Sequence, residues 1–535
     1  MPRKNTDSYS RRLLRINLPV SIGLAACVTC VAVVALAIAY KLPPAIRAGT
    51  LFYFPLLLIA WLLVPCISKT TPLFERMAER ISPWVVLGLI TIVFTLTGLY
   101  WTQASGAHSG DEGHYLIQAV SLHEDGDLDI RNNLTKEIGA ETVAKLGRDT
   151  FHISPFSRGA NWYSMHPAGL PFLLSLVASG GIIARHLVLG MIAALTALAA
   201  WCLCRRAGAS VTSSGVILMG FFGSLYAVGY ASRCLPEMLG ACLTAWLCWC
   251  VFAQKDCPWR SALLGGFCCA FLPWAHLRFY PLALLGILFY GMAGARTPEP
   301  LARKTARIGL FLCLGIGGIL FHKHIQNLMY EGGAAYAVSE VLFSYPPGLW
   351  LVFTGETGLL NVFPLAIGLL AAAIAFPFVS PARRWMAIAL AAMFGAVWLT
   401  SCGGANYHGG ATLGGRFLLA VMPLLLPAAA VLWDRVTALS RWWLLLLALV
   451  SIALCVLELL YLPSLGRSFA FPYRELPVVA PLLSGLPTPF CGGIHAILVG
   501  GLTLCALGLR QRRLAAVTVA LIVAITLGWQ IAIRM

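Results

Sequence analysis

Residues 84–115 read WVVLGLITIVFTLTGLYWTQASGAHSGDEGHY, an apolar run that ends near Trp101 and passes into a polar segment with adjacent carboxylates at Asp111 and Glu112. The apolar part is long enough for one transmembrane helix, which needs about 20 residues at a rise of about 1.5 Å each. Similar runs fill most of the chain. The polar segment that interrupts them is therefore the most informative place in the sequence.

The composition excludes an ordinary soluble domain. Of 535 residues, 59% are hydrophobic and only 11% are charged, whereas soluble domains carry about 25% charged residues. The 38 Lys and Arg exceed the 21 Asp and Glu, which gives a formal net charge of +17. In a membrane protein such an excess flanks the spans on the cytoplasmic side. No basic run is interleaved with aromatic residues, so we expect no nucleic-acid partner.

The apolar runs predict an all-α polytopic membrane protein of about 13–15 transmembrane helices. Residues 1–83 form a cytoplasmic segment with two spans, residues 84–435 a membrane core with an outer loop at 102–185, and residues 436–535 further spans with a short outer loop at 462–490. The predicted spans are 17–39, 51–67, 84–101, 186–204, 212–230, 236–253, 261–275, 279–295, 306–321, 358–379, 385–400, 415–433, 442–461, 491–509 and 514–533.

The segment 168–183 decides which side of the membrane the later loops face. It is apolar but short, and the positive-inside bias favours a segment that does not cross. In that case the acidic loop, His276, Arg278, the stretch 322–324 and the glycine-rich loop 401–416 all lie on the outer face. The cationic clusters that then face the cytoplasm are Arg205/Arg206, Lys255/Arg260, Arg296/Arg303/Lys304/Arg307, Arg383/Arg384, Arg435/Arg441 and Arg510/Arg512/Arg513.

The acidic loop itself predicts a short amphipathic helix on the membrane surface. Ser109 and Glu112 fit a capping box, and Gly126 is a suitable C-terminal cap. Leu116, Ala119, Val120 and His123 recur at helical spacing between them. Asp111 has no capping task in this arrangement, and the helix dipole favours its ionised form. It is either a catalytic carboxylate or a solvated acid at a helix start.

Five motifs follow one another along residues 84–435. They are Asp111-Glu112, Tyr163-Ser-Met-His166-Pro167-Ala-Gly169-Leu-Pro171, Ser232-Arg-Cys-Leu-Pro236-Glu237, Leu272-Pro273-Trp-Ala-His276-Leu-Arg278-Phe-Tyr280-Pro281 and Gly414-Gly-Arg416-Phe417. In this order they resemble the GT-C membrane glycosyltransferases, and among these the family 39-like group of protein O-mannosyltransferases and lipid A aminoarabinose transferases. The chain departs from that group in three ways: it lacks the second proline after His166-Pro167, two spans precede the one that leads into the acidic loop, and no large outer domain follows.

The resemblance implies a GT-C-type bundle whose outer loop carries short amphipathic helices. It also implies an inverting glycosyltransferase that takes a sugar from a polyprenyl-phosphate donor. The acceptor would be a hydroxyl of a lipid, glycan or protein at the outer face of the cytoplasmic membrane. A lipid-borne donor suits this face, because nucleotide sugars are cytoplasmic. Asp111, with Glu112, is the expected catalytic acid pair, and Asp111 would deprotonate the acceptor.

The leaving polyprenyl phosphate needs cationic partners. We expect these to be Arg278, His276, Arg416 and Lys323, although an arginine at a span end also snorkels without any ligand. The expected supporting residues are His166, His114, Glu237, Arg233 and Tyr280, with Glu237 either a plain first-turn acid or a partner of Arg233. No cofactor is required, but a divalent metal on Asp111 stays open because some relatives use one, although no second acid stands at ligand spacing.

Two other functions remain open at this level. A secondary transporter or lipid flippase would share the span count, but transporters usually show inverted repeats and ionisable residues near the midplane. A lipid-linked glycan ligase or polymerase also acts at the outer face and usually has a larger arginine-rich outer loop. The clustering of unusual polar residues at one face favours the glycosyltransferase.

Overall fold

The computed structural model describes residues 83–105, 111–144, 151–333, 345–354, 358–404, 415–436 and 438–465. Within these ranges the regular structure is helical, and β-pairing is limited to isolated bridges. The predicted spans 17–39, 51–67, 491–509 and 514–533 lie outside the described residues, as does the loop after residue 465.

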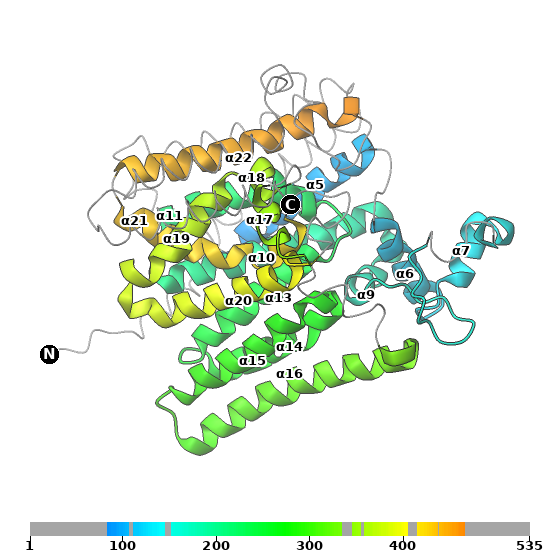
Figure 1. Ribbon diagram of the computed structural model, residues 1–535, viewed down its shortest axis with the longest axis horizontal. Helices are drawn as coiled ribbons and strands as arrows, with labels where there is room; N and C mark the ends of the chain where they lie inside the picture. The colour runs from blue at the N-terminus through cyan, green and yellow to red at the C-terminus, as the bar shows by residue number, and fades with distance from the viewer. Residues whose placement is uncertain are drawn as a thin grey trace.

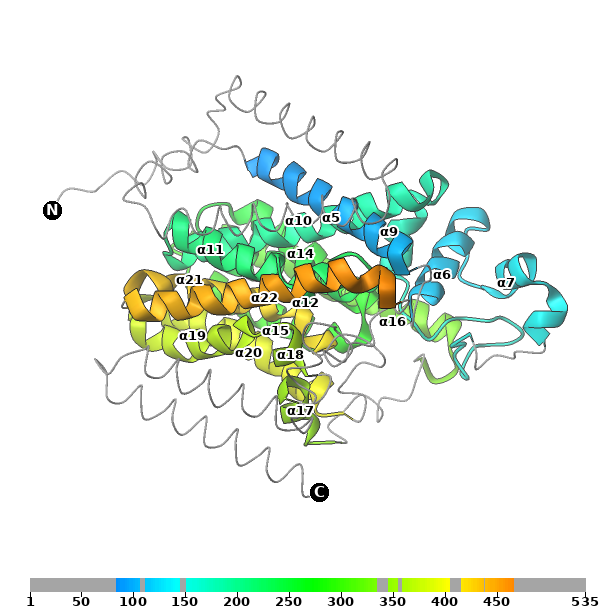
Figure 2. The same cartoon turned by 90° about the horizontal axis from the view of Figure 1, so that it is seen from above.

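The helices pack into one bundle, with α6, α7 and the loop 151–166 at one end of it in both ribbon views (Figures 1 and 2). The first half comprises α5 (Pro83–Ser105), α6 (Glu112–Glu124), α7 (Arg131–Ile138), α9 (Gly169–Ser175), η1 (Ala178–Gly180), α10 (Gly181–Ala207), α11 (Val211–Phe222), α12 (Leu225–Ala231), α13 (Glu237–Ala253), α14 (Pro258–Ala275), η2 (Leu277–Phe279) and α15 (Tyr280–Ala295). The second half comprises α16 (Leu301–Met329), η3 (Glu331–Gly333), α17 (Gly348–Thr354), α18 (Leu359–Val362), α19 (Leu365–Val379), η5 (Pro381–Arg383), α20 (Arg384–Cys402), η6 (Arg416–Ala420), η7 (Met422–Leu425), α21 (Leu426–Arg435) and α22 (Ala438–Leu465).

The described residues contain four helices that are long and apolar enough to cross a membrane, or five if the bent pair α11–α12 counts as one span. The four are Ala178–Ala207, Leu277–Ala295, Leu301–Met329 and Pro381–Cys402. Shorter apolar helices accompany them, including Glu237–Ala253 and Leu365–Val379. This set is compatible with a multi-pass membrane protein, while the predicted total of 13–15 spans stays a prediction.

Four predicted elements differ from the structure, and the first is the span 358–379, which is divided into α18 and α19 at Pro364. The span 212–230 is broken into α11 and α12, bent by 64°, because the Ser224 side chain accepts from the amide of Ala227 and starts a new helix. The span 415–433 is two 3₁₀ helices and a ten-residue helix, since Pro423 and Pro427 remove backbone donors. Finally, α16 continues to Met329, so residues 322–324 lie within a helix.

The segment 168–183 forms no membrane-length helix of its own, and its last residues belong to the candidate span Ala178–Ala207. That this segment does not cross the membrane stays a prediction. The segment forms the seven-residue α9 and the turn η1, and seven helical residues span only about 10 Å. Gly181, with a φ of 62°, then starts the long helix α10. The chain therefore re-enters the bundle at the end from which it left.

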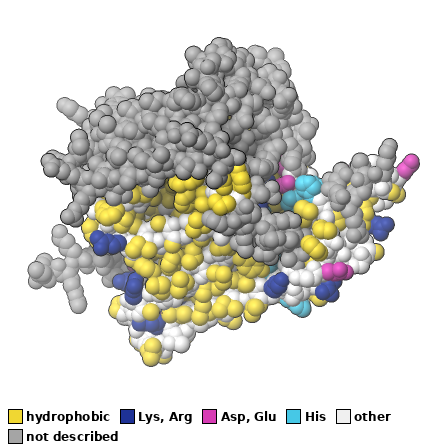
Figure 3. Space-filling view, in the orientation of Figure 1, with side chains coloured by type: hydrophobic (Ala, Val, Ile, Leu, Met, Phe, Trp, Pro, Cys, Tyr) yellow, Lys and Arg dark blue, Asp and Glu magenta, His cyan; other side chains and the backbone are white. Residues whose placement is uncertain are grey.

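One side of the bundle exposes a continuous apolar surface. Helices α14, α15 and α16 form a layer there (Figure 1), and hydrophobic side chains cover it, with Lys and Arg at its left edge (Figure 3). Only 17% of the most apolar stretch of α16 is buried inside the protein. Exposed apolar area on this scale marks an interaction surface, and lipid is the natural partner of such a helix. Its large side chains include Leu263, Phe267, Leu284, Leu288, Leu320 and Phe321.

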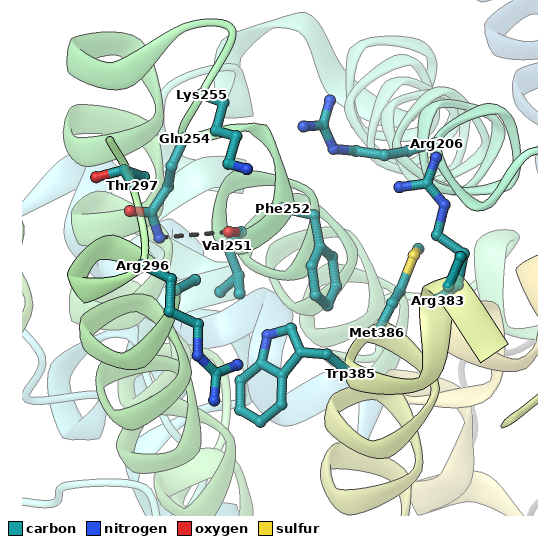
Figure 4. A pocket seen from close by; sticks show the side chains of 12 residues that line it. Arg206, Val251, Phe252, Gln254, Lys255, Arg296, Thr297, Arg383, Trp385 and Met386 are labelled. Carbon is teal, nitrogen blue, oxygen red and sulfur yellow. Dashed lines mark hydrogen bonds between the residues drawn. The ribbon is translucent and has the colours of Figure 1, made fainter. Parts of the chain in front are cut away.

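Cationic side chains gather at the end of the bundle away from α6. Arg206, Lys255, Arg296 and Arg383 line a cavity of about 240 Å³ (Figure 4). Arg206 pairs with Asp256, and the Arg296 guanidinium lies 4.5 Å from the centre of the Trp385 ring. These four residues come from four of the predicted cytoplasmic clusters. The structure therefore brings together cations that the charge pattern assigned to one side.

This arrangement predicts opposite sidedness for the two ends of the bundle. In a cysteine-depleted background, Ala160→Cys in the loop 151–166 should react with a membrane-impermeant maleimide in intact cells. Lys255→Cys should react only after permeabilisation, because α13 alone places about 25 Å between its two ends. Equal labelling of both positions in intact cells would contradict the arrangement.

Candidate functional site

Arg416 joins two carboxylates that lie far apart in the sequence. Its Nη1 is 2.7 Å from Oδ2 of Asp111, and its Nε is 2.5 Å from Oε1 of Glu237. Arg416 is 5% exposed and Glu237 is fully buried. A guanidinium offers five N–H donors in a rigid fork and so serves two acceptors at once. The start of α6, the start of α13 and η6 are therefore held at one point.

The backbone before Arg416 explains its placement. Gly415 has a φ of 72°, in the left-handed region that favours glycine. Its carbonyl accepts a hydrogen bond of 2.6 Å from the Tyr226 hydroxyl, which is buried on α12. The turn thus directs the Arg416 side chain to the beginning of α6, and the Phe417 ring lies next to the Arg416 guanidinium.

Asp111 is a carboxylate at neutral pH. Burial opposes its ionisation, but the positive charge of Arg416 and its hydrogen bond, together with His166, lower the pKa of Asp111 well below its ordinary value. Asp111 precedes α6 directly, and its side chain does not cap the helix. This leaves its Oδ1 facing the loop 151–166 rather than the helix backbone.

The predicted capping box of Ser109 and Glu112 stays a prediction, because Ser109 lies outside the described residues. Among the described residues, helix α6 begins at Glu112. The Glu112 carboxylate lies 2.6 Å from Nη1 of Arg233 and accepts a 3.0 Å hydrogen bond from the Cys234 amide. The Arg233 guanidinium also lies over the Trp101 ring, 5.6 Å from its centre. Glu112 therefore anchors α6 against the connection between α12 and α13.

The alternative in which Glu237 pairs with Arg233 is wrong, because each residue has a different partner. Arg233 binds Glu112 and Glu237 binds Arg416. Pro236 lies between Arg233 and the first residue of α13. The Arg233 and Glu237 side chains, on either side of this proline, contact different helices. Their closeness in the sequence did not predict these partners.

The buried face of α6 also differs from the prediction. Ala119 is buried as expected, but His123 is exposed and Leu116 and Val120 are only partly buried. The buried residues include Tyr115, Ile117, Gln118 and Ser121. The helix packs against α9, so its inner side is set by protein contacts. The predicted end is confirmed, since Gly126 has a φ of 74° and its amide bonds to Ser121.

Three histidines gather beside Asp111, and we call His114, His152 and His166 the His cluster. Nδ1 of His152 is 3.0 Å from Nε2 of His166, and the His114 and His152 rings stack at 4.2 Å. Oδ1 of Asp111 is 3.8 Å from Nε2 of His166 and 4.0 Å from Nδ1 of His152. All three ligand atoms of the cluster lie within 4.8 Å of one another.

The loop 151–166 builds the cluster by folding back on itself. The Ser154 amide bonds to the Tyr163 carbonyl at 2.8 Å, and the Met165 amide bonds to the His152 carbonyl at 2.9 Å. His152 has a φ of 47°, which is uncommon for a non-glycine residue. Tyr330, just after α16, fastens the loop through a 2.7 Å hydrogen bond from its hydroxyl to the Ser164 carbonyl.

Sequence reasoning selected His114 and His166 but missed His152. The sequence signal that could have found His152 is the local density of histidines, because five of the 11 lie between residues 102 and 166.

The two predicted histidines have lowered pKa values. Burial lowers the pKa of His114 to about 4, and the charge of His152 acts in the same direction. Burial lowers the pKa of His166 to about 3, although Asp111 acts to raise it. Both imidazoles are therefore neutral at physiological pH.

His276 and Arg278 lie beside this group. The His276 Nδ1 accepts a 3.1 Å hydrogen bond from the Arg278 amide, which closes the turn between α14 and α15. The Arg278 guanidinium packs on the Phe417 ring at 3.7 Å from its centre, a cation–π contact. Because Phe417 follows Arg416 directly, the second guanidinium of the candidate site stands next to the first.

Tyr280 and Lys323 belong to a separate group of contacts. The Tyr280 hydroxyl is 2.8 Å from Nδ1 of His322, and Lys323 donates to the carbonyl of Gly333 at 2.5 Å. Both contacts lie near the C-terminal end of α16, which Tyr330 follows. The expected roles of Lys323 as a phosphate contact and of Tyr280 as a supporting residue stay predictions.

Removing the Arg416 guanidinium should strongly destabilise the protein. Arg416→Ala leaves Glu237 and Asp111 without their cation, and breaking a buried pair costs about 3–5 kcal/mol. The loss is measurable as a lower midpoint of thermal unfolding in detergent. Lys136→Ala, which removes an exposed pair with Glu124, is the control and should leave the midpoint unchanged. Equal midpoints for both variants would contradict the role of Arg416.

Glu112 and Arg233 should be coupled in stability. Glu112→Gln and Arg233→Gln should each lower the unfolding midpoint, and the double variant should lose less than the sum because it leaves no unpaired buried charge. A double-mutant cycle on thermal unfolding measures this coupling. Strict additivity would show that the contact does not hold α6.

A scan against models of known protein families found no match, and a search of curated proteins found none either. The function proposed next is therefore drawn from the chemistry of the site.

Proposed function

We propose that the chain is an inverting glycosyltransferase that moves a sugar from a polyprenyl phosphate to a hydroxyl acceptor at a membrane surface. The observation that carries this proposal is an ionised, largely buried carboxylate, Asp111, held by Arg416 beside a second guanidinium, Arg278. A base and an anion-binding cation at the end of an apolar bundle are the two groups that such a transfer needs.

The chemistry is a single displacement. The acceptor oxygen attacks the anomeric carbon from the face opposite the phosphate, and its proton passes to the Asp111 carboxylate. The bond between the anomeric carbon and the phosphate oxygen breaks, and its electron pair leaves with the polyprenyl phosphate. Because its lowered pKa makes Asp111 a weak base, it takes the proton late, when the new bond to the anomeric carbon has already made the acceptor O–H acidic.

The two arginines have different tasks in this proposal. Arg416 already serves Asp111 and Glu237, so we assign it to positioning the carboxylate rather than to the donor phosphate. Arg278 lies in a turn between two helices and rests on Phe417. We assign Arg278 to the phosphate, with His276 fixing that turn. Glu112, bound to Arg233, supports α6 and is not assigned a catalytic role.

The outer surface of the bundle supports a donor carried by lipid. Helices α14 and α15 meet at the turn that holds Arg278, and both expose large apolar side chains, among them Phe267 and Leu284. A polyprenyl chain lying along these helices would bring its phosphate to the turn.

Asp111→Asn tests the base. The amide keeps the shape of the side chain but accepts no proton, and general-base catalysis contributes about 10²–10⁴-fold, so transfer should fall by that factor. Mass spectrometry of envelope lipids and glycans from a deletion strain identifies the product, and complementation with each variant measures it. Glu124→Gln, exposed on the same helix, is the control. Full activity of Asp111→Asn in folded protein would overturn the proposal.

Arg278→Ala tests the phosphate contact. Loss of one charge-stabilising group should lower turnover by about 10²–10³-fold, and Arg278→Lys should recover part of it because the charge remains. The assay is sugar transfer from a synthetic polyprenyl-phosphate donor in proteoliposomes. Counterflow of a labelled solute without a covalent product would instead identify a transporter.

A further inference from the structure

The His cluster has the composition of a metal site. Three imidazoles converge here. His114 comes from the start of α6, and His152 and His166 come from the two ends of the folded loop 151–166. Imidazole nitrogen is a preferred ligand of zinc and its neighbours among the divalent transition metals, whereas magnesium and calcium prefer oxygen. The ligand type therefore points to a zinc-class ion rather than to the carboxylate-bound metal considered from the sequence.

The distances are close to those that a metal requires. Ligand nitrogens of a tetrahedral zinc site lie about 3.3 Å apart, because Zn–N bonds are about 2.0–2.1 Å long. The His152 and His166 nitrogens are 3.0 Å apart, and the third ligand atom lies within 4.8 Å of both. Small rotations of the rings bring all three to bonding distance.

A backbone contact also orients one of the three imidazoles, so that the lone pair of its other nitrogen is available to a metal. His114 makes a further hydrogen bond to the backbone carbonyl of Phe151. Such a bond on the other ring nitrogen fixes the tautomer and orientation of a metal-bound histidine.

The Asp111 carboxylate lies beside the His cluster, where a fourth metal ligand would stand. Its Oδ1 lies 3.8–4.0 Å from the nitrogens of His166 and His152, which is too far for a hydrogen bond. Its Oδ2 is held by Arg416 at 2.7 Å. One oxygen of the carboxylate is thus fixed by a cation while the other faces the three nitrogens.

We propose that His114, His152 and His166 bind one divalent transition-metal ion of the zinc class, with Oδ1 of Asp111 facing its fourth coordination position. Catalytic zinc sites keep three protein ligands and one open position, and this arrangement has the same form. The metal site is independent of the identity of the sugar and acceptor. It stands even if sugar transfer is not observed.

The test measures metal binding directly. The full chain, purified in detergent with any affinity tag removed and stripped with chelator, is titrated with Zn²⁺, and bound metal is counted by mass spectrometry after desalting. We expect about one ion per chain. His152→Ala should weaken binding at least about 100-fold, since even groups that only orient ligands contribute 10–100-fold. His123→Ala, exposed on the same helix as His114, is the matched control and should bind as the wild type does.

Thermal unfolding gives a second readout that does not depend on activity. Zn²⁺ should raise the unfolding midpoint of the wild type and of His123→Ala, because a ligand that binds the folded state stabilises it. The shift should vanish in His152→Ala, whose side chain is 42% exposed in the wild type and is removable without a core cavity. Absence of bound metal in the wild type, or equal affinity in His152→Ala and His123→Ala, would overturn the proposal.

Discussion

The contact of Arg416 with both Asp111 and Glu237 is the constraint on which the described structure depends. It joins the start of α6, the start of α13 and the turn before η6 within a buried region. A buried carboxylate without a cation is costly, so these three segments have to be assembled together or not at all. The charge that stabilises the bundle end is the same charge that keeps Asp111 ionised.

The rest of the site is arranged around this contact in two layers. On one side, Glu112 and Arg233 fix the first turn of α6 through a second buried pair, and Phe417 carries the Arg278 guanidinium. On the other side, the loop 151–166 brings His152 and His166 to the free oxygen of Asp111. Rigid support of a carboxylate, a cation and three imidazoles is what the proposed transfer and the proposed metal site together require.

The two ends of the bundle have different chemistry. Acidic and histidine side chains lie at the end near α6, whereas Arg206, Lys255, Arg296 and Arg383 line a cavity at the other. The helices between them expose large apolar side chains along α14–α16. Such a distribution suits a protein whose middle is covered by lipid and whose ends face two different aqueous surfaces.

The sequence by itself determined the helical class with membrane-length apolar runs, because apolar run length is a local property. It also singled out Asp111 and a set of arginines and histidines as candidates, and it correctly predicted that Gly126 ends α6. That residues 168–183 do not cross stays a prediction. Only the tertiary structure decided the partners: Glu112 with Arg233, Glu237 with Arg416, and His152 with His166. The two ion pairs join residues more than one hundred positions apart and depend on how helices pack, while the histidine pair depends on where a loop folds back. Neither spacing nor composition contains that information.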